Sequence, residues 1–484
     1  MNFARDVVDA APAGARALVA IACEGNRREW SFGEISACSA LLAATFEAHG
    51  VRRGETVMTL IGNRPEWVLA MVACFRIGAV ALPCNEQLRA HDLKVRLTAA
   101  RPKLIVADER NLHELGAASP DCEVLTIPDD RLYGAAEPAR AAELAASDPC
   151  LITFTSGTTG EPKGVVHAQR YLPGQRLQAE HWLDAREGEL VWCTAASGWS
   201  KSARNVFVAP WLRGAAALLH DARFDPAQRL EILEREGVDV LCMAPTEYRV
   251  IAKRAQLRPL PRLRGLVAAG EALNPEVIRA FHEATGLEIR DGYGQTETGQ
   301  LTANPIGAPV RPGSMGRPLP GVDLRVEDSE LVLADPRTDP TFFLTYLGDG
   351  PAPTERPWHT GDRVSRDEDG YLYFEGRTDD VIISAGYRIG PFEVESALVS
   401  HRAVAEAAVV EAPDPERGAL VRAVVVLRDG FSPSAALASE LQDHVKKETA
   451  PYKYPRIVDF VPELPKTTSG KVRRALLRAQ RPGA

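Results

Sequence analysis

Residues 55–83 read ETVMTLIGNRPEWVLAMVACFRIGAVALP, and their pattern predicts the fold class. An apolar run at 57–61 is followed by a break at 63–65, a helical stretch at 66–77 and a second apolar run at 79–83. Short apolar runs that alternate with helix-length segments are typical of βαβ units on a largely parallel sheet. The stretch therefore predicts an α/β fold for the main body of the chain.

The same rhythm recurs further along the chain, at 88–107 and at 226–243. After about residue 319 it changes to short apolar runs separated by turns, which suit antiparallel strands and predict a smaller β sub-domain. The end of the chain alternates short strands with a helix at 435–447, enough for a small α+β domain. We therefore expect a large domain over residues 1–378 and a small one over 379–484.

Composition excludes several classes of protein. The chain has 484 residues, 45% of them hydrophobic and 25% charged, as in soluble globular proteins of more than one domain. Lys and Arg total 57 against 65 Asp and Glu, and the resulting net charge of -8 argues against nucleic acid as a partner. The eight cysteines lie between Cys23 and Cys242 without a CxxC pair, so neither a zinc site nor a disulfide framework is indicated.

Nothing in the sequence predicts a membrane segment. The most apolar stretch, 68–75, is far shorter than the roughly 20 residues that a membrane-spanning helix needs, so we read it as a buried helix. The first residues include Asp6 and Asp9 and lack the basic and then apolar plan of a secretory signal. We therefore expect a cytoplasmic protein.

The most informative loop is TFTSGTTGEPKG at 153–164, directly after an apolar run. Its glycines allow backbone amides to approach an anion, its hydroxyl groups donate hydrogen bonds, and Lys163 adds a positive charge. This composition predicts a phosphate-binding loop, although it lacks the GxxxxGK[ST] spacing of the common nucleotide P-loop. A flexible polar loop is the alternative for any short string of this kind.

Together with four further strings in order, this loop resembles the adenylate-forming superfamily, which includes acyl-CoA synthetases, peptide-synthetase adenylation domains and beetle luciferases. The strings are DGYGQTETG at 291–299, HTGD at 359–362, GRTDDVIISAGYRIGPFEVE at 376–395 and PKTTSGK at 465–471. Details such as GWSKS at 198–202, APW at 209–211 and APYKYP at 450–455 are most similar to medium-chain acyl-CoA synthetases.

The resemblance implies an AMP-forming carboxylic acid:CoA ligase that uses ATP, Mg²⁺ and coenzyme A. Such an enzyme makes an acyl adenylate and pyrophosphate, and then acyl-CoA and AMP. The acid would be a medium-chain fatty acid or another small hydrophobic or aromatic acid. By the same resemblance, the residues that bind ATP or AMP would be Thr155, Ser156, Gly157, Thr158, Thr159, Gly160, Lys163, Gly270, Glu271, Asp291, Gly292, Tyr293, Gly294, Gln295, Thr296, Asp362, Arg377 and Lys471.

Charge chemistry agrees with several of these roles. Glu297 would hold Mg²⁺ with help from the Thr158 or Thr296 region, because one carboxylate plus substrate phosphates suits that ion. Asp362 would accept hydrogen bonds from the ribose hydroxyls, and Tyr293 would stack on adenine. Lys471 would supply the main catalytic charge, with Glu297 and Thr158 as the other catalytic residues. A strand-end salt bridge is the alternative for Asp362 and Arg377, and a solvated tail is the alternative for Lys471.

For the second half-reaction, the family rotates its C-terminal domain about a hinge that corresponds to Asp379. The CoA-binding residues implied are Ala385, Gly386, Tyr387, Arg388, Arg417 and Lys446. Coenzyme A is a polyanion, so separated cations make physical sense, although surface Arg and Lys are ordinarily just solvated.

The acyl pocket would be built from Trp199, Ala244, Pro245 and Thr246, with core packing as the alternative for Trp199 and Trp211. Arg204 departs from the aromatic residue that the medium-chain group carries after Lys-Ser-Ala, which leaves the length and polarity of the acid open. Two other functions stay open: an adenylating enzyme that acylates a separate carrier protein, and a catalytically silent nucleotide-binding relative. A homodimer is also compatible with the resemblance.

Overall fold

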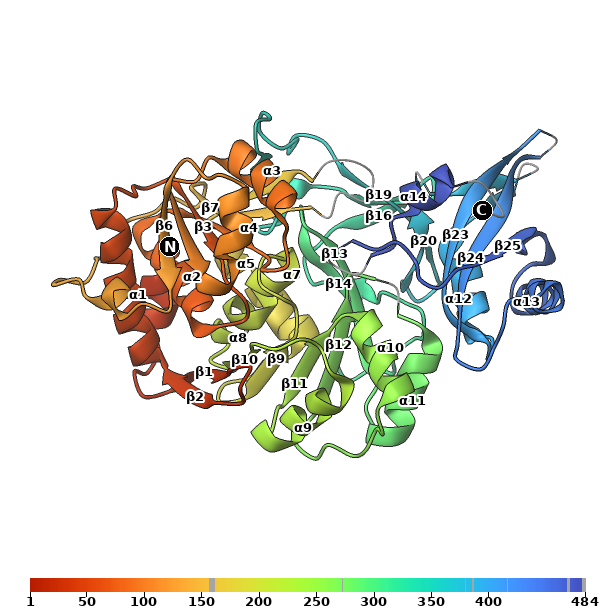
Figure 1. The fold of residues 1–484 in the computed structure, drawn as a ribbon, viewed down its shortest axis with the longest axis horizontal. Coiled ribbons are helices and arrows are strands. Elements are labelled where there is room, and N and C mark those ends of the chain that lie inside the picture. The colour runs from red at the N-terminus through yellow and green to blue at the C-terminus, as the bar shows by residue number, and fades with distance from the viewer. Residues whose placement is uncertain are drawn as a thin grey trace.

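The computed structural model describes residues 1–155, 162–271, 273–378, 380–384, 387–415, 417–467 and 471–480, with Arg388 described by its backbone alone. Two large sheets stand side by side in the N-terminal part, and a smaller unit at the C-terminal end lies beyond them (Figure 1). This is the α/β architecture that the sequence predicts.

The first large sheet has nine strands in the described residues, and most of its neighbouring pairs are parallel. In spatial order its strands are β15 (Arg317–Pro318), β14 (Gly299–Ala303), β13 (Ile289–Gln295), β12 (Gly265–Ala269), β11 (Val240–Met243), β9 (Leu190–Cys193), β10 (Ala216–His220), β1 (Arg16–Ile21) and β2 (Arg27–Ser31).

The second large sheet contains the stretch at 55–83. In spatial order its described strands are β18 (Thr345–Tyr346), β8 (Gly164–Ala168), β7 (Pro149–Phe154), β4 (Val80–Cys84), β3 (Thr56–Leu60), β5 (Leu104–Asp108) and β6 (Glu123–Ile127). Strands β3 and β4 pair in parallel, with α2 (Pro65–Ile77) between them in the chain. The βαβ prediction is therefore confirmed, and α2 begins at Pro65 because proline suits the first helical turn.

Helices cover both outer faces of the sheets and fill the space between them. The longer ones are α1 (Phe32–Ala48), α2, α3 (Ala90–Ala100), α4 (Leu112–Ala117), α9 (Pro226–Glu236), α10 (Pro245–Arg254) and α11 (Pro275–Thr285). The short ones are η1 (Ala4–Asp9), η2 (Glu109–Asn111), η3 (Asp130–Tyr133), α5 (Tyr171–Gly174), α6 (Arg176–Gln178), η4 (Ala179–Leu183), α7 (Ser200–Ala203), η5 (Arg204–Val208), α8 (Ala209–Trp211) and η6 (Pro336–Thr338).

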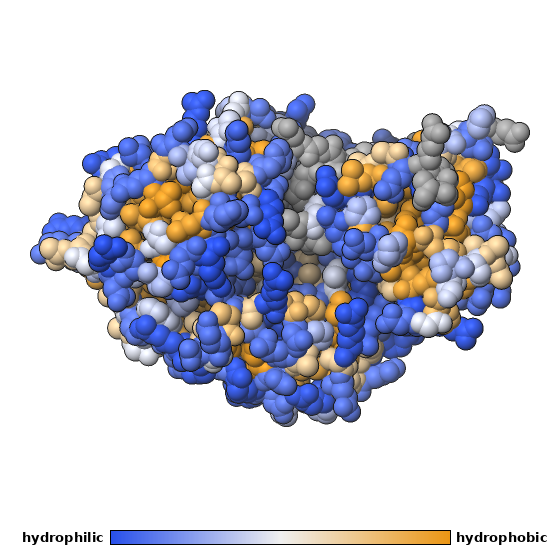
Figure 2. Space-filling model, in the orientation of Figure 1, coloured by the Kyte–Doolittle hydropathy of each residue, from blue (hydrophilic) through white to orange (hydrophobic). Residues whose placement is uncertain are grey.

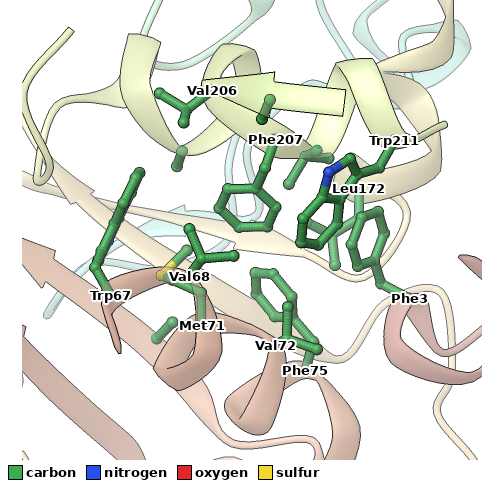
Figure 3. Packing of buried hydrophobic residues seen from close by; sticks show 14 of the residues in the cluster. Phe3, Trp67, Val68, Met71, Val72, Phe75, Leu172, Val206, Phe207 and Trp211 are labelled. Atoms are coloured by element: carbon green, nitrogen blue, oxygen red, sulfur yellow. The ribbon is translucent and has the colours of Figure 1, made fainter. Parts of the chain in front are cut away.

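The main hydrophobic core lies between the two sheets. There α2 packs against η5 and α8, with the Phe207 ring 5.8 Å from Trp67 and 4.9 Å from Trp211 between centroids (Figure 3). Trp211 also donates a hydrogen bond from its indole nitrogen to the Ala17 carbonyl, so it is a core residue. Because η5 continues α7, this packing fixes the segment that carries Trp199 and Arg204 toward the edge of the sheet.

An antiparallel sheet follows, as predicted, and a separate C-terminal unit comes after it. The antiparallel sheet consists of β16 (Leu324–Glu327), β17 (Glu330–Leu333), β19 (Trp358–Arg366) and β20 (Leu372–Arg377). The C-terminal unit contains β21 (Ile382–Ser384), β22 (Tyr387–Ile389), α12 (Pro391–Ser400), β23 (Val404–Asp414), β24 (Gly418–Leu427), α13 (Ala435–Glu448), η7 (Pro451–Lys453), β25 (Ile457–Phe460) and α14 (Arg474–Ala479).

The C-terminal unit has its own hydrophobic core, formed mainly by β23, β24, α12 and α13. Apolar residues also gather on its surface over β23 and β24 (Figure 2). In the described residues, the side chain of Lys253 on α10 reaches this unit and donates a hydrogen bond to the Ala405 carbonyl at 3.0 Å. The Phe392 ring of α12 also packs against the Phe374 ring of β20, at 6.2 Å between centroids, so the C-terminal unit contacts the larger part at α10 and at β20.

Candidate active site

Many of the predicted site residues lie at the carboxyl ends of neighbouring parallel strands, β11, β12 and β13. Lys201 marks this edge, because its Nζ atom donates hydrogen bonds of 2.9 Å to the carbonyl oxygens of Met243 and Ala269, the last residues of β11 and β12. Ligands of open α/β sheets bind at such edges. Sequence reasoning did not assign Lys201 a role, although it lies within the GWSKS string.

Asp362 is the centre of one cluster at this edge. Its Oδ2 atom accepts hydrogen bonds from the Tyr293 hydroxyl at 2.5 Å and from Gln295 Nε2 at 2.8 Å, and its Oδ1 atom accepts one from Arg377 Nη1 at 3.1 Å. Asp362 is 5% exposed, so these donors take the place of water. The predicted nucleotide residues of β13, β19 and β20 are therefore brought together.

Burial, reinforced by the Asp362 carboxylate, raises the pKa of the Tyr293 hydroxyl well above its usual value. Tyr293 is therefore a neutral donor at physiological pH. Its partners also hold one another, because Gln295 Nε2 donates to the Thr360 carbonyl at 2.7 Å and Trp358 Nε1 donates to Gln295 Oε1 at 3.2 Å. The cluster is a fixed polar network.

Steric crowding explains why glycine occupies positions 292 and 294 of the string at 291–299. A Cβ atom on Gly294 would lie 1.8 Å from the Gly299 carbonyl oxygen, and one on Gly292 would lie 2.4 Å from Gln300 Nε2. The register between β13 and β14 shifts between Tyr293 and Gly294. Only glycine permits the two strands to approach this closely, so the turn that carries Thr296 and Glu297 returns directly to the sheet.

Glu297 forms a second cluster with Tyr346 and Lys163. The Tyr346 hydroxyl donates to Glu297 Oε1 at 2.9 Å, and the Lys163 ammonium lies 5.2 Å from the centre of the Tyr346 ring. Thr155 is held beside Lys163, because the Lys163 amide donates to Thr155 Oγ1 at 3.0 Å and the Thr155 amide donates to the Lys163 carbonyl at 2.9 Å. Tyr346 was missed from the sequence, since it lies outside every motif and comes close only because β18 pairs with β8.

Asp291 is buried within β13, two residues before Tyr293. Burial raises the pKa of its carboxyl to about 8, against the opposing effects of the Gly292 amide and of Lys201. The amide of Gly292 donates to its Oδ1 atom at 2.9 Å. A neutral carboxylic acid at this position can donate as well as accept a hydrogen bond.

The predicted acyl segment and the predicted adenine residues are connected. Thr246 Oγ1 donates to Glu271 Oε2 at 2.7 Å, and Arg249 Nη2 donates to Thr246 Oγ1 at 2.9 Å. Pro245 is buried at the start of α10, and Gly270 has a φ of +102°. Trp199, by contrast, is only half-buried at the start of α7, so it is not a core residue.

The predicted CoA residues lie on the C-terminal unit. The rings of Tyr387 and Tyr452, both exposed, stack at 4.3 Å, and the Lys446 ammonium lies 4.4 Å above the Tyr454 ring. Arg417 directly precedes Gly418. Gly418 lies next to the β21–β22 hairpin, because a Cβ atom added to it would stand 3.7 Å from the Ile383 carbonyl oxygen. These contacts form an aromatic and cationic surface.

Lys471 is exposed on the same unit. Its backbone pairs with Thr467, whose amide donates to the Lys471 carbonyl at 2.8 Å. Within the described residues, no hydrogen bond or ion pair joins the Lys471 side chain to the clusters around Asp362 and Glu297. The structure therefore does not bring Lys471 together with the other predicted catalytic residues.

Several predicted site residues lie outside the described residues: Ser156, Gly157, Thr158, Thr159, Gly160, Asp379, Ala385 and Gly386, and with them the side chain of Arg388. Among the residues that are described, no group of three or more His, Cys, Asp or Glu side chains could hold a metal ion. Nor, over the same ranges, does any helix have the length and apolar character needed to cross a membrane.

Comparisons with known proteins agree with this geometry. The sequence model of the AMP-binding enzyme family matches residues 5–337, and that of the AMP-binding enzyme C-terminal domain matches residues 393–471. The chain is 40% identical to the mitochondrial acyl-coenzyme A synthetase ACSM4 of Rattus norvegicus, over 99% of this chain and 90% of the relative.

Two solved structures are similar over almost their whole length. The anthranilate CoA ligase AuaEII in complex with anthranoyl-AMP has a TM-score of 0.87 and 28% identity, covering 98% of this chain and 96% of that one. ATP-bound MatB from Rhodopseudomonas palustris has a TM-score of 0.87 and 26% identity, covering 99% of this chain and 98% of that one.

Proposed function

Because this chain belongs to the AMP-binding enzyme family and is an AMP-forming acyl-CoA synthetase that uses ATP and coenzyme A, we propose that its substrate is a medium-chain or other small hydrophobic or aromatic acid. One observation carries the proposal: the Asp362 cluster and the Glu297 cluster lie at the carboxyl edge that also holds Lys201. With the nucleoside of ATP at the Asp362 cluster and its phosphates at the Glu297 cluster, the carboxylate of the acid would lie beside Lys201.

In the adenylation step, the carboxylate oxygen attacks the α-phosphorus of ATP and pyrophosphate leaves. Two anions must meet, so the site has to supply positive charge and hydrogen bonds. We assign the ribose hydroxyls to Asp362 and the β- and γ-phosphates to Thr155 and Lys163. Arg377, which donates a hydrogen bond to Asp362, could instead donate to a phosphate of ATP, because its side chain is 41% exposed.

The residues around Glu297 fit a Mg²⁺ ion. Tyr346 donates to one carboxylate oxygen of Glu297, Oε1. A single protein carboxylate suits an ion that draws its remaining ligands from water and phosphate. The bound ion would offset phosphate charge. Glu297 would orient it, and Tyr346 would hold Glu297 in place.

In the second step, the thiol sulfur of coenzyme A attacks the acyl carbonyl and AMP leaves. We propose that the chain divides at 378 and 379 and that the C-terminal unit rotates about Asp379, bringing Lys471 to the site for the first step and the surface around Tyr387 for the second. The stacked Tyr387 and Tyr452 rings and the Lys446 charge support binding of a nucleotide with phosphates. Rotation would have to break the hydrogen bond from Lys253 to the Ala405 carbonyl and the packing of Phe392 against Phe374.

A panel of carboxylic acids tests the proposal. Pyrophosphate exchange into ATP should require an acid, and AMP and acyl-CoA should form in equal amounts when coenzyme A is added. No exchange with short, medium, branched or aromatic acids would contradict the proposal and favour a silent nucleotide-binding protein. Exchange without thioester formation, rescued by a carrier protein bearing phosphopantetheine, would favour the carrier alternative.

Two further expectations stay predictions. A homodimer can be tested by measuring the mass of the protein in solution. The cytoplasmic location expected from the first residues can be tested by fractionation, and the name of the rat relative is that of a mitochondrial protein.

A further inference from the structure

Arg204 is a buried cation that lacks a carboxylate partner among the described residues. It is the first residue of η5 and is 5% exposed, and its Nε and Nη1 atoms have no hydrogen-bond partner. No carboxylate in the described part of the chain forms an ion pair with it. A buried charge without a partner is costly, so a protein that keeps one at a fixed place normally gives it a ligand.

Arg204 lies beside the turn that carries Glu297. Its Nη1 atom lies 3.5 Å from the point where a Cβ atom on Gly299 would stand, and Gly299 is two residues beyond Glu297. Lys201, one helical turn earlier, contacts the carbonyl of Met243 at the sheet edge. The charges of Lys201 and of Arg204 both act on Cys242, the residue before Met243 in β11.

The two titratable groups that interact most directly with Arg204, His167 and Tyr171, do not supply a negative charge at pH 7. Burial, and then Arg204 itself, lowers the pKa of His167 to about 3, so this ring is neutral at pH 7. Burial raises the pKa of the Tyr171 hydroxyl, and Arg204 only partly opposes that shift. Asp339 is a buried carboxyl on the far side of Thr341, and its pKa is raised by burial to about 6, so it is mostly ionised at pH 7. Its Oδ1 atom accepts hydrogen bonds from the amide and the hydroxyl of Thr341, and it forms no ion pair with Arg204 in the described residues.

The segment is also held in place. Phe207, one turn after Arg204, packs between Trp67, Phe3 and Trp211 in the main core (Figure 3). The backbone of η5 therefore cannot move the guanidinium to solvent without opening the core. The Arg204 guanidinium is therefore a donor held in a fixed position.

We propose that Arg204 binds a second carboxylate on the acid, so that the preferred substrates are dicarboxylic acids with an apolar body. This inference rests on the proposed function and refines its substrate class. One carboxylate is adenylated at the sheet edge and passes to the sulfur of coenzyme A, while the other stays ionised on the guanidinium. The product is a thioester that keeps one free carboxylate.

The test compares acids matched in carbon number: hexanoate with hexanedioate, octanoate with octanedioate, and benzoate with terephthalate. For the wild-type enzyme we expect kcat/KM to favour at least one dicarboxylate by about 100-fold or more, since a site built for a polar group rejects the analogue that lacks it. Arg204→Met should reverse this preference, and Arg204→Lys should keep part of it. Arg213→Met, at the other end of the same segment, is the matched control and should leave the ratio unchanged.

A wild-type enzyme that prefers the monocarboxylate of every pair would overturn the inference by itself, even if Arg204→Met fails to fold. The inference would also be overturned if Arg204→Met had the melting temperature and ATP affinity of the wild type and yet the same ratio of kcat/KM between dicarboxylate and monocarboxylate. The two proposals fail in different ways. Thioester formation with monocarboxylates alone removes only the role of Arg204, whereas no acid-dependent exchange removes the proposed function and this inference with it.

Discussion

The hydroxyl of Tyr293 donates a hydrogen bond to Oδ2 of Asp362 at 2.5 Å, and this contact joins β13 of the nine-stranded sheet to β19 of the antiparallel sheet. Gln295 reinforces it by donating to the same oxygen at 2.8 Å. Asp362 is thereby fixed before any ligand arrives. A nucleotide ribose at this carboxylate must share it with donors that the protein already provides.

Asp362→Asn should weaken ATP binding. The amide can no longer accept from Tyr293, Gln295 and Arg377 together, and it places a donor against donors. We expect kcat/KM for ATP in acid-dependent pyrophosphate exchange to fall by about 10- to 150-fold, since loss of hydrogen bonds to a buried charged acceptor costs about 1.5–3 kcal/mol. Asp367→Asn, just beyond the end of β19, is the control. Similar losses in the two variants would contradict a ribose role for Asp362.

Tyr293→Phe and Tyr293→Ala should separate the two roles of this residue. Phenylalanine keeps the ring and loses the hydroxyl, and Gln295 still holds Asp362, so we expect KM for ATP to rise only a few-fold, as for a lost neutral hydrogen bond. Alanine also loses the aromatic face and should raise KM further. Equal effects of the two substitutions would mean that the ring does not stack on adenine.

The fold was predictable because local patterns determine it. The segment at 55–83 became β3, α2 and β4 with boundaries within one residue or so of the expected ones. Helix α12 and strand β25 were not predicted, since β25 is a half-buried edge strand that is stabilised by pairing in parallel with β24. Pairing between distant segments leaves no local signal in the sequence.

Glu297→Gln should make the enzyme demand more Mg²⁺. The neutral side chain can still accept from Tyr346 but offers the ion no charge, so half-maximal pyrophosphate exchange should need about tenfold more Mg²⁺ or more, as for loss of a charged ligand. Tyr346→Phe should shift the same titration by a smaller factor, because it frees Glu297 without removing its charge. A Mg²⁺ titration of both variants checks this. An unchanged midpoint in Glu297→Gln would place the ion elsewhere.

Asp291 should make stability depend on pH. Its pKa is about 8 in the folded protein against 3.8 for an ordinary aspartate, so between these values the folded state keeps a proton that the unfolded chain releases. The contribution of the protonated Asp291 carboxyl to the free energy of unfolding is therefore fully present below pH 3.8 and is lost as pH rises toward 8. The Asp291→Asn side chain cannot ionise, so the variant does not lose stability in this way as pH rises. The difference in melting temperature between the variant and the wild type should therefore be larger, in favour of the variant, at about pH 8 than at about pH 5.

The exposed Asp130→Asn is the control for this series, and it should shift the melting temperature equally at every pH. A constant difference between Asp291→Asn and the wild type from about pH 5 to 8 would show that the Asp291 carboxyl ionises normally in the folded state.

The site was only partly predictable. Glu297, Tyr293 and Asp362 belong to ordered strings, so their types and places could be read from the sequence. Tyr346 could not, because it reaches Glu297 only through the pairing of β18 with β8. The state of Asp291 depends on burial, which is a property of the whole fold and of no single motif.

Lys471→Ala should separate the two half-reactions. Lys471 is exposed on the C-terminal unit, and no described contact of its side chain reaches Glu297 or Asp362, so its charge can act there only after the unit moves. If that movement belongs to adenylation, the variant should lose about 100-fold or more in pyrophosphate exchange, as for a lost transition-state charge. Thioester formation from supplied acyl adenylate should stay within a few-fold of the wild type. Lys466→Ala, which removes a lysine paired with Glu406, is the matched control for the same segment and should affect neither step strongly. Equal loss of both steps in Lys471→Ala would mean that one arrangement of the two units serves both reactions.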